Sequence, residues 1–348
     1  MLEYIRKIIS TADVLALYME WVTMKTEILK LLRATDGYVS GQQISEQLGV
    51  SRAAVWKAIR RLQDEGYQVE AVRNKGYHIV GTPDVMTKEE LDSLMKTRWA
   101  GRNILYYETT DSTNLRIRQA GDEGAPHGTL AVADRQTAGR GRRGRTWESP
   151  AGSSIYMSVL LRPDIAPNKA SMLTLVMALS VAEGIQQCIP IIQIKWPNDI
   201  IVNGKKLVGI LTEMSAQVDY INHVTVGVGI NVNMTAFQEE IADTATSLRL
   251  ECGHAVKRAP LIAAVMERLE ENYEIFLETE DLSGLMERYS ALLVNRDRDV
   301  RIIGEKETYQ AHAIGIDRTG ELIVRREDGT MEKIYAGEVS VRGVYGYV

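Results

Sequence analysis

Cysteine is scarce in this chain, with only two residues among 348, Cys188 and Cys252. They lie far apart and form no Cys-x-x-Cys or Cys/His spacing, so the sequence offers no disulfide framework. Because free cysteines persist in reducing compartments, we expect the protein in the cytoplasm. The five histidines are equally scattered, and no metal site made of protein side chains is predicted.

Long uninterrupted apolar runs are also missing. Residues 1–23 look apolar in part, but Glu3, Arg6 and Asp13 interrupt them and no small-residue cleavage site follows. This pattern is neither a membrane span nor a secretory signal, so no membrane partner is predicted. This extension has two possible interpretations. It results from a translation start upstream of Met24, the residue at which an amphipathic helix pattern begins, or it forms a genuine extra helix.

Positive charge is not in excess over the whole chain. The net charge of −5 excludes a polyanion bound over the entire surface, yet residues 24–80 carry nine basic and six acidic residues, a net +3. The length predicts two or three domains with a sizeable core. A local basic surface on an otherwise acidic protein is the electrostatic footprint of a nucleic-acid reader.

Residues 24–81 combine three short helical patterns with a hairpin. Ser40 and Ser51 stand where side chains cap the second and third helices, and Gly49 and Gly66 stand where those helices end. Two short strand patterns joined by an Asn-Lys-Gly turn follow. We interpret this region as a winged helix-turn-helix domain.

The third helix of that domain has a basic exposed face, with no acidic residue between positions 51 and 61. This face predicts operator DNA as a partner, whereas the alternative is a small helical dimerisation module. The predicted DNA contacts are Ser51, Arg52, Ala53, Lys57, Arg60, Arg61 and, in the wing, Lys75.

The rest of the chain alternates strand and helix patterns. In residues 85–295 the hairpins are closely spaced, which favours a mixed or antiparallel sheet flanked by helices rather than a doubly wound parallel sheet. Residues 298–348 hold only short strands and glycine turns, which are typical of a small β-barrel. The predicted fold class is therefore α+β.

An arginine- and glycine-rich run is the most informative segment. Within Thr137–Trp147 four arginines alternate with three glycines and no acidic residue. Glycine lets the backbone approach a ligand, and each guanidinium offers a fork of donors to carboxylate or phosphate. An isolated run of this kind is commonly a disordered nucleic-acid-binding tract. This one is short and lies between two apolar strand patterns, so we interpret it as an anion-binding loop.

Five motifs together resemble one family, the bifunctional biotin–protein ligases that also repress the biotin operon. The motifs are Asp111–Asn114, Gln136–Trp147, Lys195–Asp199, Gly204–Ile210 and Gly227–Asn231. Their order and spacing, after a winged helix and before a small barrel, make the resemblance specific, and it spans residues 24–348. It implies a class II synthetase-like central domain and an SH3-like barrel. Residues 1–23 match nothing in the family's pattern.

The resemblance implies a reaction in two halves. Biotin and ATP, with Mg²⁺ on the phosphates, give biotinyl-5′-AMP and pyrophosphate, and a lysine of a biotin carboxyl carrier domain then displaces AMP. Biotin's carboxylate is already ionised at pH 7, so the first half needs positive charge rather than a base. The resemblance also implies that biotinyl-5′-AMP acts as corepressor and that the adenylate-bound protein is a homodimer.

The same resemblance assigns the site residues, with Lys195, Arg142 and Arg140 as the catalytic group. The expected biotin contacts are Ser112, Thr113, Asn114, Gln136, Arg140, Gly141, Arg142, Lys195, Gly227 and Gly229. The expected adenylate contacts are Arg142, Arg143, Arg145, Trp147, Asn198 and Asn231. The neutral polar side chains suit biotin's uncharged ureido ring, although Ser112 is also placed to cap a helix. Asp199 is left open between orienting Lys195, assisting the incoming amine and capping a turn.

Three alternatives remain at this point. The protein could be a ligase whose winged helix has no DNA-binding role, a lipoate-attaching ligase on the same catalytic fold, or a DNA-binding sensor of small anions without turnover. The basic third helix opposes the first alternative, and the arginine run with Lys-Trp-Pro-Asn-Asp opposes the other two.

Overall fold

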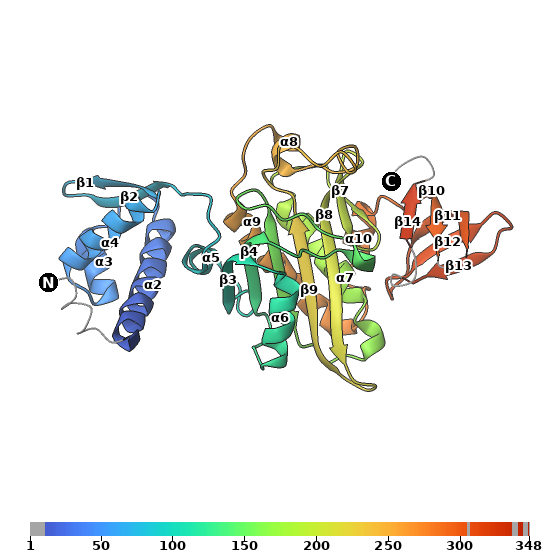
Figure 1. Ribbon diagram of the computed structural model, residues 1–348, viewed down its shortest axis with the longest axis horizontal. Coiled ribbons are helices and arrows are strands. Elements are labelled where there is room, and N and C mark those ends of the chain that lie inside the picture. The colour runs from blue at the N-terminus through green and yellow to red at the C-terminus, as the bar shows by residue number, and fades with distance from the viewer. Residues whose placement is uncertain (1–10, 305–306, 336–339, 344–346, 348) are drawn as a thin grey trace. The chain divides into compact units, whose positions relative to one another are not determined.

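The computed structural model describes residues 11–304, 307–335, 340–343 and 347 (Figure 1). Residues 1–10 of the N-terminal extension and residues 305–306, 336–339, 344–346 and 348 of the predicted barrel lie outside that set. The chain divides into two compact units, Met1–Leu94 and Met95–Val348. The domain limits drawn from the sequence, at 81–85 and 295–298, stay predictions.

The first unit holds the predicted helices and hairpin. Its elements are α2 (Thr11–Ala34), α3 (Gly41–Leu48), α4 (Arg52–Asp64), β1 (Gln68–Val72), β2 (Gly76–Gly81) and α5 (Lys88–Leu94). The Ser40 hydroxyl accepts the Gln43 N–H and the Ser51 hydroxyl accepts the Ala54 N–H, which confirms both predicted caps. Gly49 ends α3 at φ +64°, a conformation that glycine adopts without strain.

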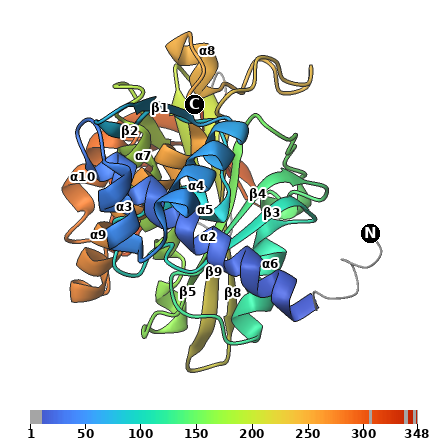
Figure 2. The same cartoon turned by 90° about the vertical axis from the view of Figure 1, so that its left-hand side faces the viewer.

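The first helix is longer than the sequence pattern indicated. An opening at Met24 was predicted, whereas α2 begins at Thr11 and passes through that residue without a break (Figure 2). Trp21 packs against the apolar core of the unit, which includes Ile28, Ile59 and Leu62. This core contact favours helix in the turn just before Met24 because it gives that turn a partly buried side chain.

The second unit is built on a seven-stranded mixed sheet in the order β3-β4-β5-β9-β8-β7-β6. The strands are β3 (Ile104–Thr110), β4 (Leu130–Gln136), β5 (Ile155–Leu161), β6 (Gln193–Lys195), β7 (Asp199–Val202), β8 (Lys205–Ala216) and β9 (Ile221–Ile230). Only β3 and β4 pair in parallel, and the other neighbours are antiparallel. The predicted α+β class is therefore confirmed.

Helices cover both faces of this sheet. The short helix α6 (Thr113–Asp122) packs on one face through Ile117, and α7 (Met172–Ile185) and α9 (Arg258–Thr279) pack together on the other (Figure 1). Every residue of β5 is buried as a result. The smaller α8 (Leu248–Cys252) and α10 (Met286–Leu292) complete the helices of the described part.

The C-terminal sheet is antiparallel, in the order β13-β12-β11-β10-β14. Its strands are β10 (Arg298–Ile303), β11 (Thr308–Ile316), β12 (Leu322–Arg326), β13 (Met331–Ile334) and β14 (Ser340–Gly343), in keeping with the predicted small barrel. The buried Trp196 indole donates its N–H to the Gly320 carbonyl at 2.9 Å. A turn of the central domain is thereby anchored to the C-terminal sheet.

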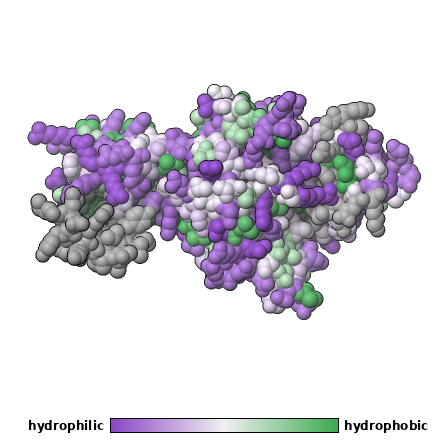
Figure 3. All heavy atoms as spheres, in the orientation of Figure 1, coloured by the Kyte–Doolittle hydropathy of each residue, from purple (hydrophilic) through white to green (hydrophobic). Residues whose placement is uncertain are grey.

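Apolar exposure is limited on the face seen in Figure 3, which is mostly hydrophilic. The large apolar side chains that are exposed are spread over several elements, and Val218, between β8 and β9, is the most exposed of them at 92%. Among the described residues, no helix combines the length and apolarity needed to cross a bilayer.

Candidate functional site

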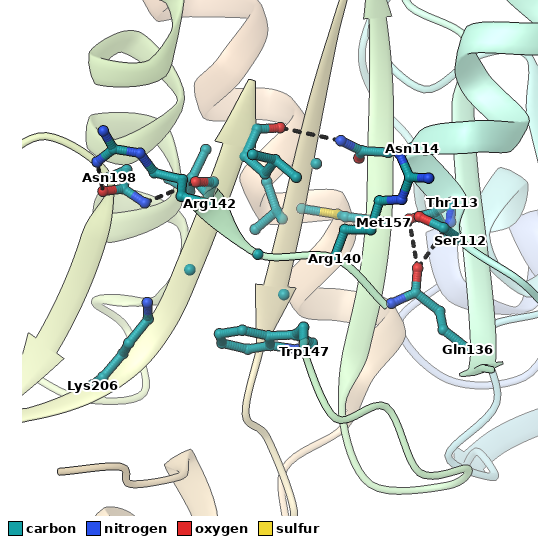
Figure 4. A pocket seen from close by; sticks show the side chains of 17 residues that line it. Ser112, Thr113, Asn114, Gln136, Arg140, Arg142, Trp147, Met157, Asn198 and Lys206 are labelled. Atoms are coloured by element: carbon teal, nitrogen blue, oxygen red, sulfur yellow. Dashed lines mark hydrogen bonds between the residues drawn. The ribbon is translucent and has the colours of Figure 1, made fainter. Parts of the chain in front are cut away.

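One pocket collects most of the residues that the motifs predicted (Figure 4). It lies at the start of α6, on the sheet face that α6 covers. Alternate residues of β8 and β9 point to this face, because side chains along a strand alternate between the two sides. The lining residues are Ser112, Thr113, Asn114, Gln136, Arg140, Gly141, Arg142, Trp147, Met157, Asn198, Lys206, Gly209, Ile210, Leu211, Gly227, Val228 and Gly229.

A connected network of neutral polar groups forms one end of the pocket. The Gln136 side-chain oxygen accepts the Thr113 N–H at 2.8 Å, and the Ser158 hydroxyl donates to the Asn114 side-chain oxygen at 2.7 Å. The Asn114 amide then donates to Glu213 at 2.8 Å. These bonds fix the direction of each amide, so the pocket presents a defined set of donors and acceptors.

Ser112 occupies the N-cap position of α6 but makes no side-chain capping bond. It is 2% exposed and lines the pocket. Of the two roles that the sequence left open for this hydroxyl, helix capping is therefore absent from the structure.

Glycines let two lining side chains lie directly against the sheet at this site. A Cβ at Gly227 would stand 2.0 Å from the Asn114 side-chain oxygen, and one at Gly229 would stand 2.6 Å from the Trp147 indole. Gly209 faces the same indole at 2.8 Å. Asn114 and Trp147 take the space that side chains would otherwise fill. They lie closer to the strand backbone than any residue other than glycine at positions 209, 227 and 229 would permit.

The arginine-rich loop folds as a small closed hairpin. Arg140 and Thr146 form a β-bridge, and the Gly141 N–H donates to the Arg145 carbonyl at 2.7 Å. The one-turn 3₁₀ segment between them includes Arg143 at φ +56°. As a consequence, Arg140 and Arg142 line the pocket. Arg143 and Arg145, which the structure also describes, are not part of its lining.

Arg142 is the more deeply placed of the two pocket arginines. Its guanidinium donates to the Asn198 side-chain oxygen at 3.0 Å. Burial lowers the pKa of the Arg142 guanidinium, with the neighbouring Asp199 carboxylate acting in the opposite direction. Arg140 lies 3.9 Å from Glu213 and is about half exposed. Arg140 thus lies beside the polar network, near the Glu213 carboxylate that accepts the Asn114 amide, whereas Arg142 and Lys206 lie at the opposite end of the pocket (Figure 4).

Lys195 is not among the lining residues, although its register with Asp199 and Gly209 places it on the same face of the sheet as the pocket. It ends β6, is 4% exposed and faces Asp199 across the β6–β7 ladder. Asp199 pairs with the lining residue Lys206 at 2.7 Å. Asn231 is also outside the lining: its amide donates to the Thr246 carbonyl at 3.1 Å, so it joins β9 to the segment before α8.

The helix α4 carries the predicted DNA-binding face. Arg52, Ala53, Lys57 and Arg60 are exposed along it. Arg61 is exposed too, but its guanidinium lies 4.1 Å from the centre of the Trp21 ring. Two further predicted contacts have local partners: Ser51 caps the helix, and the Lys75 ammonium lies 5.7 Å from the Tyr38 ring centre.

Several site residues were absent from the sequence prediction. On α4, Trp56 is 53% exposed beneath the Arg60 guanidinium. In the pocket, Lys206 and Gly209 belong to a motif quoted for the resemblance, which was the available signal. The remaining additions are the lining residues Met157, Ile210, Leu211 and Val228. They are apolar strand residues, whose sequence pattern indicates only burial.

Three family models match the chain in order. The HTH domain matches residues 25–78, the biotin/lipoate A/B protein ligase family matches residues 106–231, and the biotin protein ligase C-terminal domain matches residues 297–342. The fold agrees with a solved biotin protein ligase from Aquifex aeolicus in complex with biotin and ATP. The superposition covers 70% of this chain and 99% of the Aquifex chain, with 32% sequence identity and a TM-score of 0.61.

Curated relatives match nearly the whole length. The bifunctional ligase/repressor BirA of Bacillus subtilis strain 168 is 39% identical over 323 residues, which are 92% of this chain and 99% of the relative. The protein of the same name from Escherichia coli strain K12 is 32% identical over 322 residues. The chain therefore belongs to the family of bifunctional biotin–protein ligases and repressors. The alternative of a sensor without enzymatic turnover is wrong.

Proposed function

We propose that the pocket performs both halves of biotin attachment with the residues named above. The observation that carries this proposal is the division of one pocket into a polar network around Thr113, Asn114 and Gln136 and an opposite end with the cations Arg142 and Lys206, with Arg140 beside the network (Figure 4). Biotin has the matching division, since its ureido ring is uncharged and its valeryl chain ends in a carboxylate. A lipoyl group has no ureido group to pair with the polar end.

Biotin is proposed to enter with its ureido ring against Ser112, Thr113, Asn114 and Gln136. The support is their fixed hydrogen-bond geometry and the Ser112 hydroxyl, which makes no capping bond. A ring held by oriented donors and acceptors binds specifically, because an analogue lacking them would leave those buried polar groups unpaired. Gly227 and Gly229 let the Asn114 side chain and the Trp147 indole lie against the sheet in this part of the site.

The carboxylate of biotin then points toward Arg140 and Arg142. One of its oxygens attacks the α-phosphorus of ATP, the bond to the β-phosphate oxygen breaks, and pyrophosphate leaves. Guanidinium groups aimed at this centre stabilise the negative charge that develops there. Lys195 is proposed to supply a third positive charge, and Gly141 to let the loop backbone approach the adenylate.

In the second half, the ε-amine of a lysine on a biotin carboxyl carrier domain attacks the acyl carbon, and AMP leaves with its phosphate oxygen. Trp147 and Asn198 are proposed to contact the adenylate, with Arg143, Arg145 and Asn231 as outer contributors. The buried Trp147 indole N–H has no partner among the described residues, and the indole lines the pocket. This unpaired donor beside the pocket is the support for a contact between Trp147 and the adenylate.

Mg²⁺ is proposed to bind through the phosphate oxygens of ATP. In the described part of the chain no group of three or more potential ligand side chains gathers, and the carboxylates near the pocket, Glu213 and Asp199, already pair with Asn114 and Lys206. This donor set fits a metal carried by the nucleotide rather than one held by the protein. When bound, it offsets phosphate charge.

The winged helix is proposed to bind operator DNA as part of a homodimer that forms in the adenylate-bound state. The support is the exposed basic face of α4 and the single recognition helix in each chain, which contacts one half-site. Biotinyl-5′-AMP is then the corepressor. The proposed compartment is the cytoplasm, where both the operator and carrier domains are found.

Pyrophosphate release tests the proposal directly. We expect release from ATP to depend on biotin and not on lipoate, and operator binding to tighten when biotin and ATP are both present. Equal release with lipoate would overturn the biotin assignment. Operator affinity that ignores both substrates would leave a ligase without the repressor switch.

A further inference from the structure

Tyr347 contacts the catalytic domain at the turn that carries Lys195. The Lys195 ammonium lies 3.3 Å from the centre of the Tyr347 ring. The Tyr347 hydroxyl donates to the Asp199 carboxylate, which is the cross-strand partner of Lys195. A single tyrosine from beyond β14 therefore touches both ends of the Trp196–Asn198 turn.

Trp196 in the same turn has two further partners, of which Gly320 belongs to the C-terminal domain and Asn295 to the central one. The Trp196 indole N–H donates to the Gly320 carbonyl, and the Trp196 backbone N–H donates to Asn295 at 2.8 Å. These bonds fix the backbone of the turn, but they do not reach the end of the Lys195 side chain. The Tyr347 ring does reach it.

A lysine side chain has four rotatable bonds and loses conformational freedom when its ammonium is held in one place. Lys195 is 4% exposed, so its charge lies where water screens little. The face of an aromatic ring attracts such a cation, and the attraction strengthens when the cation is desolvated. Tyr347 thus restricts the ammonium to a small region beside Asp199.

This contact extends to the lining of the pocket. Asp199, which accepts the Tyr347 hydroxyl, also pairs with Lys206 at 2.7 Å, and the Lys206 ammonium lies 5.4 Å from the Trp147 ring centre. A continuous chain of charged and aromatic contacts therefore joins Tyr347 to the pocket.

We propose that Tyr347 is a positioning residue that holds the Lys195 ammonium in place for adenylate formation, with its hydroxyl anchoring the ring on Asp199. Tyr347 does not contact the reacting atoms and acts only through Lys195. The proposal rests on the catalytic role proposed for Lys195, and it makes the C-terminal domain a contributor to the first half-reaction.

The test compares Tyr347→Leu, Tyr347→Phe and the control Tyr335→Leu in the full-length chain. Tyr335 is 52% exposed in the same domain and so controls for loss of a tyrosine there. For Tyr347→Leu we expect kcat for biotin-dependent pyrophosphate release to fall about tenfold, with the KM for biotin unchanged, which is the scale of a desolvated cation–π contact. Tyr347→Phe keeps the ring and should recover to within about threefold.

A second measurement does not depend on activity. The rate at which an amine-acetylating reagent modifies Lys195, followed by peptide mass spectrometry, should rise about tenfold in Tyr347→Leu and stay unchanged in Tyr335→Leu. Wild-type kcat and wild-type labelling in Tyr347→Leu would overturn the proposal, and so would a rise in kcat, because the ring would then be an obstruction. A different result would overturn the catalytic role of Lys195 instead. In that case Lys195 is labelled faster in Tyr347→Leu, but the Lys195→Ala variant keeps full activity.

Discussion

At the residue scale, the positive charges around the pocket are the first target. We predict that Lys195→Ala and Arg142→Ala each reduce single-turnover adenylate formation by about 10²- to 10³-fold, since a charge aimed at the transition state typically contributes about 3–4 kcal/mol. Thermal unfolding should show that both variants fold. The exposed Arg118 on α6 provides the control, because Arg118→Ala removes the same charge away from this pocket. Near-normal adenylation by either variant would contradict the assignment.

The glycines of the sheet face allow an equally direct test. In Gly227→Ala the added methyl group would stand 2.0 Å from the Asn114 side-chain oxygen, so Asn114 must move and the polar end of the pocket loses its geometry. We predict biotin affinity about 5- to 150-fold weaker, which corresponds to a clash of about 1–3 kcal/mol. Calorimetric titration with biotin measures it.

Gly315→Ala is the matched control for that variant, since a Cβ there meets nothing within 4 Å. It should bind biotin as the unaltered protein does. Unchanged affinity in Gly227→Ala would mean that Asn114 does not contact biotin.

At the scale of single elements, the upstream part of α2 is the informative one. Trp21 packs on the core of the first unit and lies under the Arg61 guanidinium, so a chain that begins at Met24 loses both contacts. We predict that this shortened chain has a first unit destabilised by about 1–2 kcal/mol and binds operator DNA more weakly, with adenylation unchanged.

The full-length Trp21→Ala variant should reproduce that loss, which separates the contact from the length of the chain. Denaturant unfolding and operator titration are the measurements. If the shortened chain matches the full one in stability and in DNA affinity, the upstream segment contributes nothing to the fold.

At the scale of the whole molecule, the expected behaviour is a linkage between ligand and assembly. A bound adenylate that neutralises Arg140 and Arg142 lowers the cost of ordering the loop that carries them, and any dimer surface beside that loop then forms more readily. Dimerisation and adenylate binding must strengthen each other by the same factor. We predict that a non-hydrolysable adenylate analogue shifts the protein to dimer and tightens operator binding.

Sedimentation velocity and operator titration, with and without the analogue, measure this linkage. Transfer of biotin to a carrier domain should return the chain toward monomer and release DNA. If neither assembly nor DNA affinity responds to the analogue, the switch is wrong even where ligase and DNA-binding activities are both present.

The sequence alone determined the element order and the motifs, because these depend on local signals. Caps such as Ser40 and Ser51 and alternating strand patterns act over a few residues and need no tertiary context. The arginine-rich run and the Lys195–Asp199 motif were likewise visible as written, and the family resemblance followed from their spacing.

Tertiary structure decided which of these residues face one another. Met157 lines the pocket because sheet pairing brings β5 beside β9, and Trp21 extends the first helix because a core exists for it to pack on. Tyr347 reaches Lys195 across 152 positions of sequence, the difference between their residue numbers. No local pattern encodes such contacts, since they arise only when burial and strand pairing fold distant segments together.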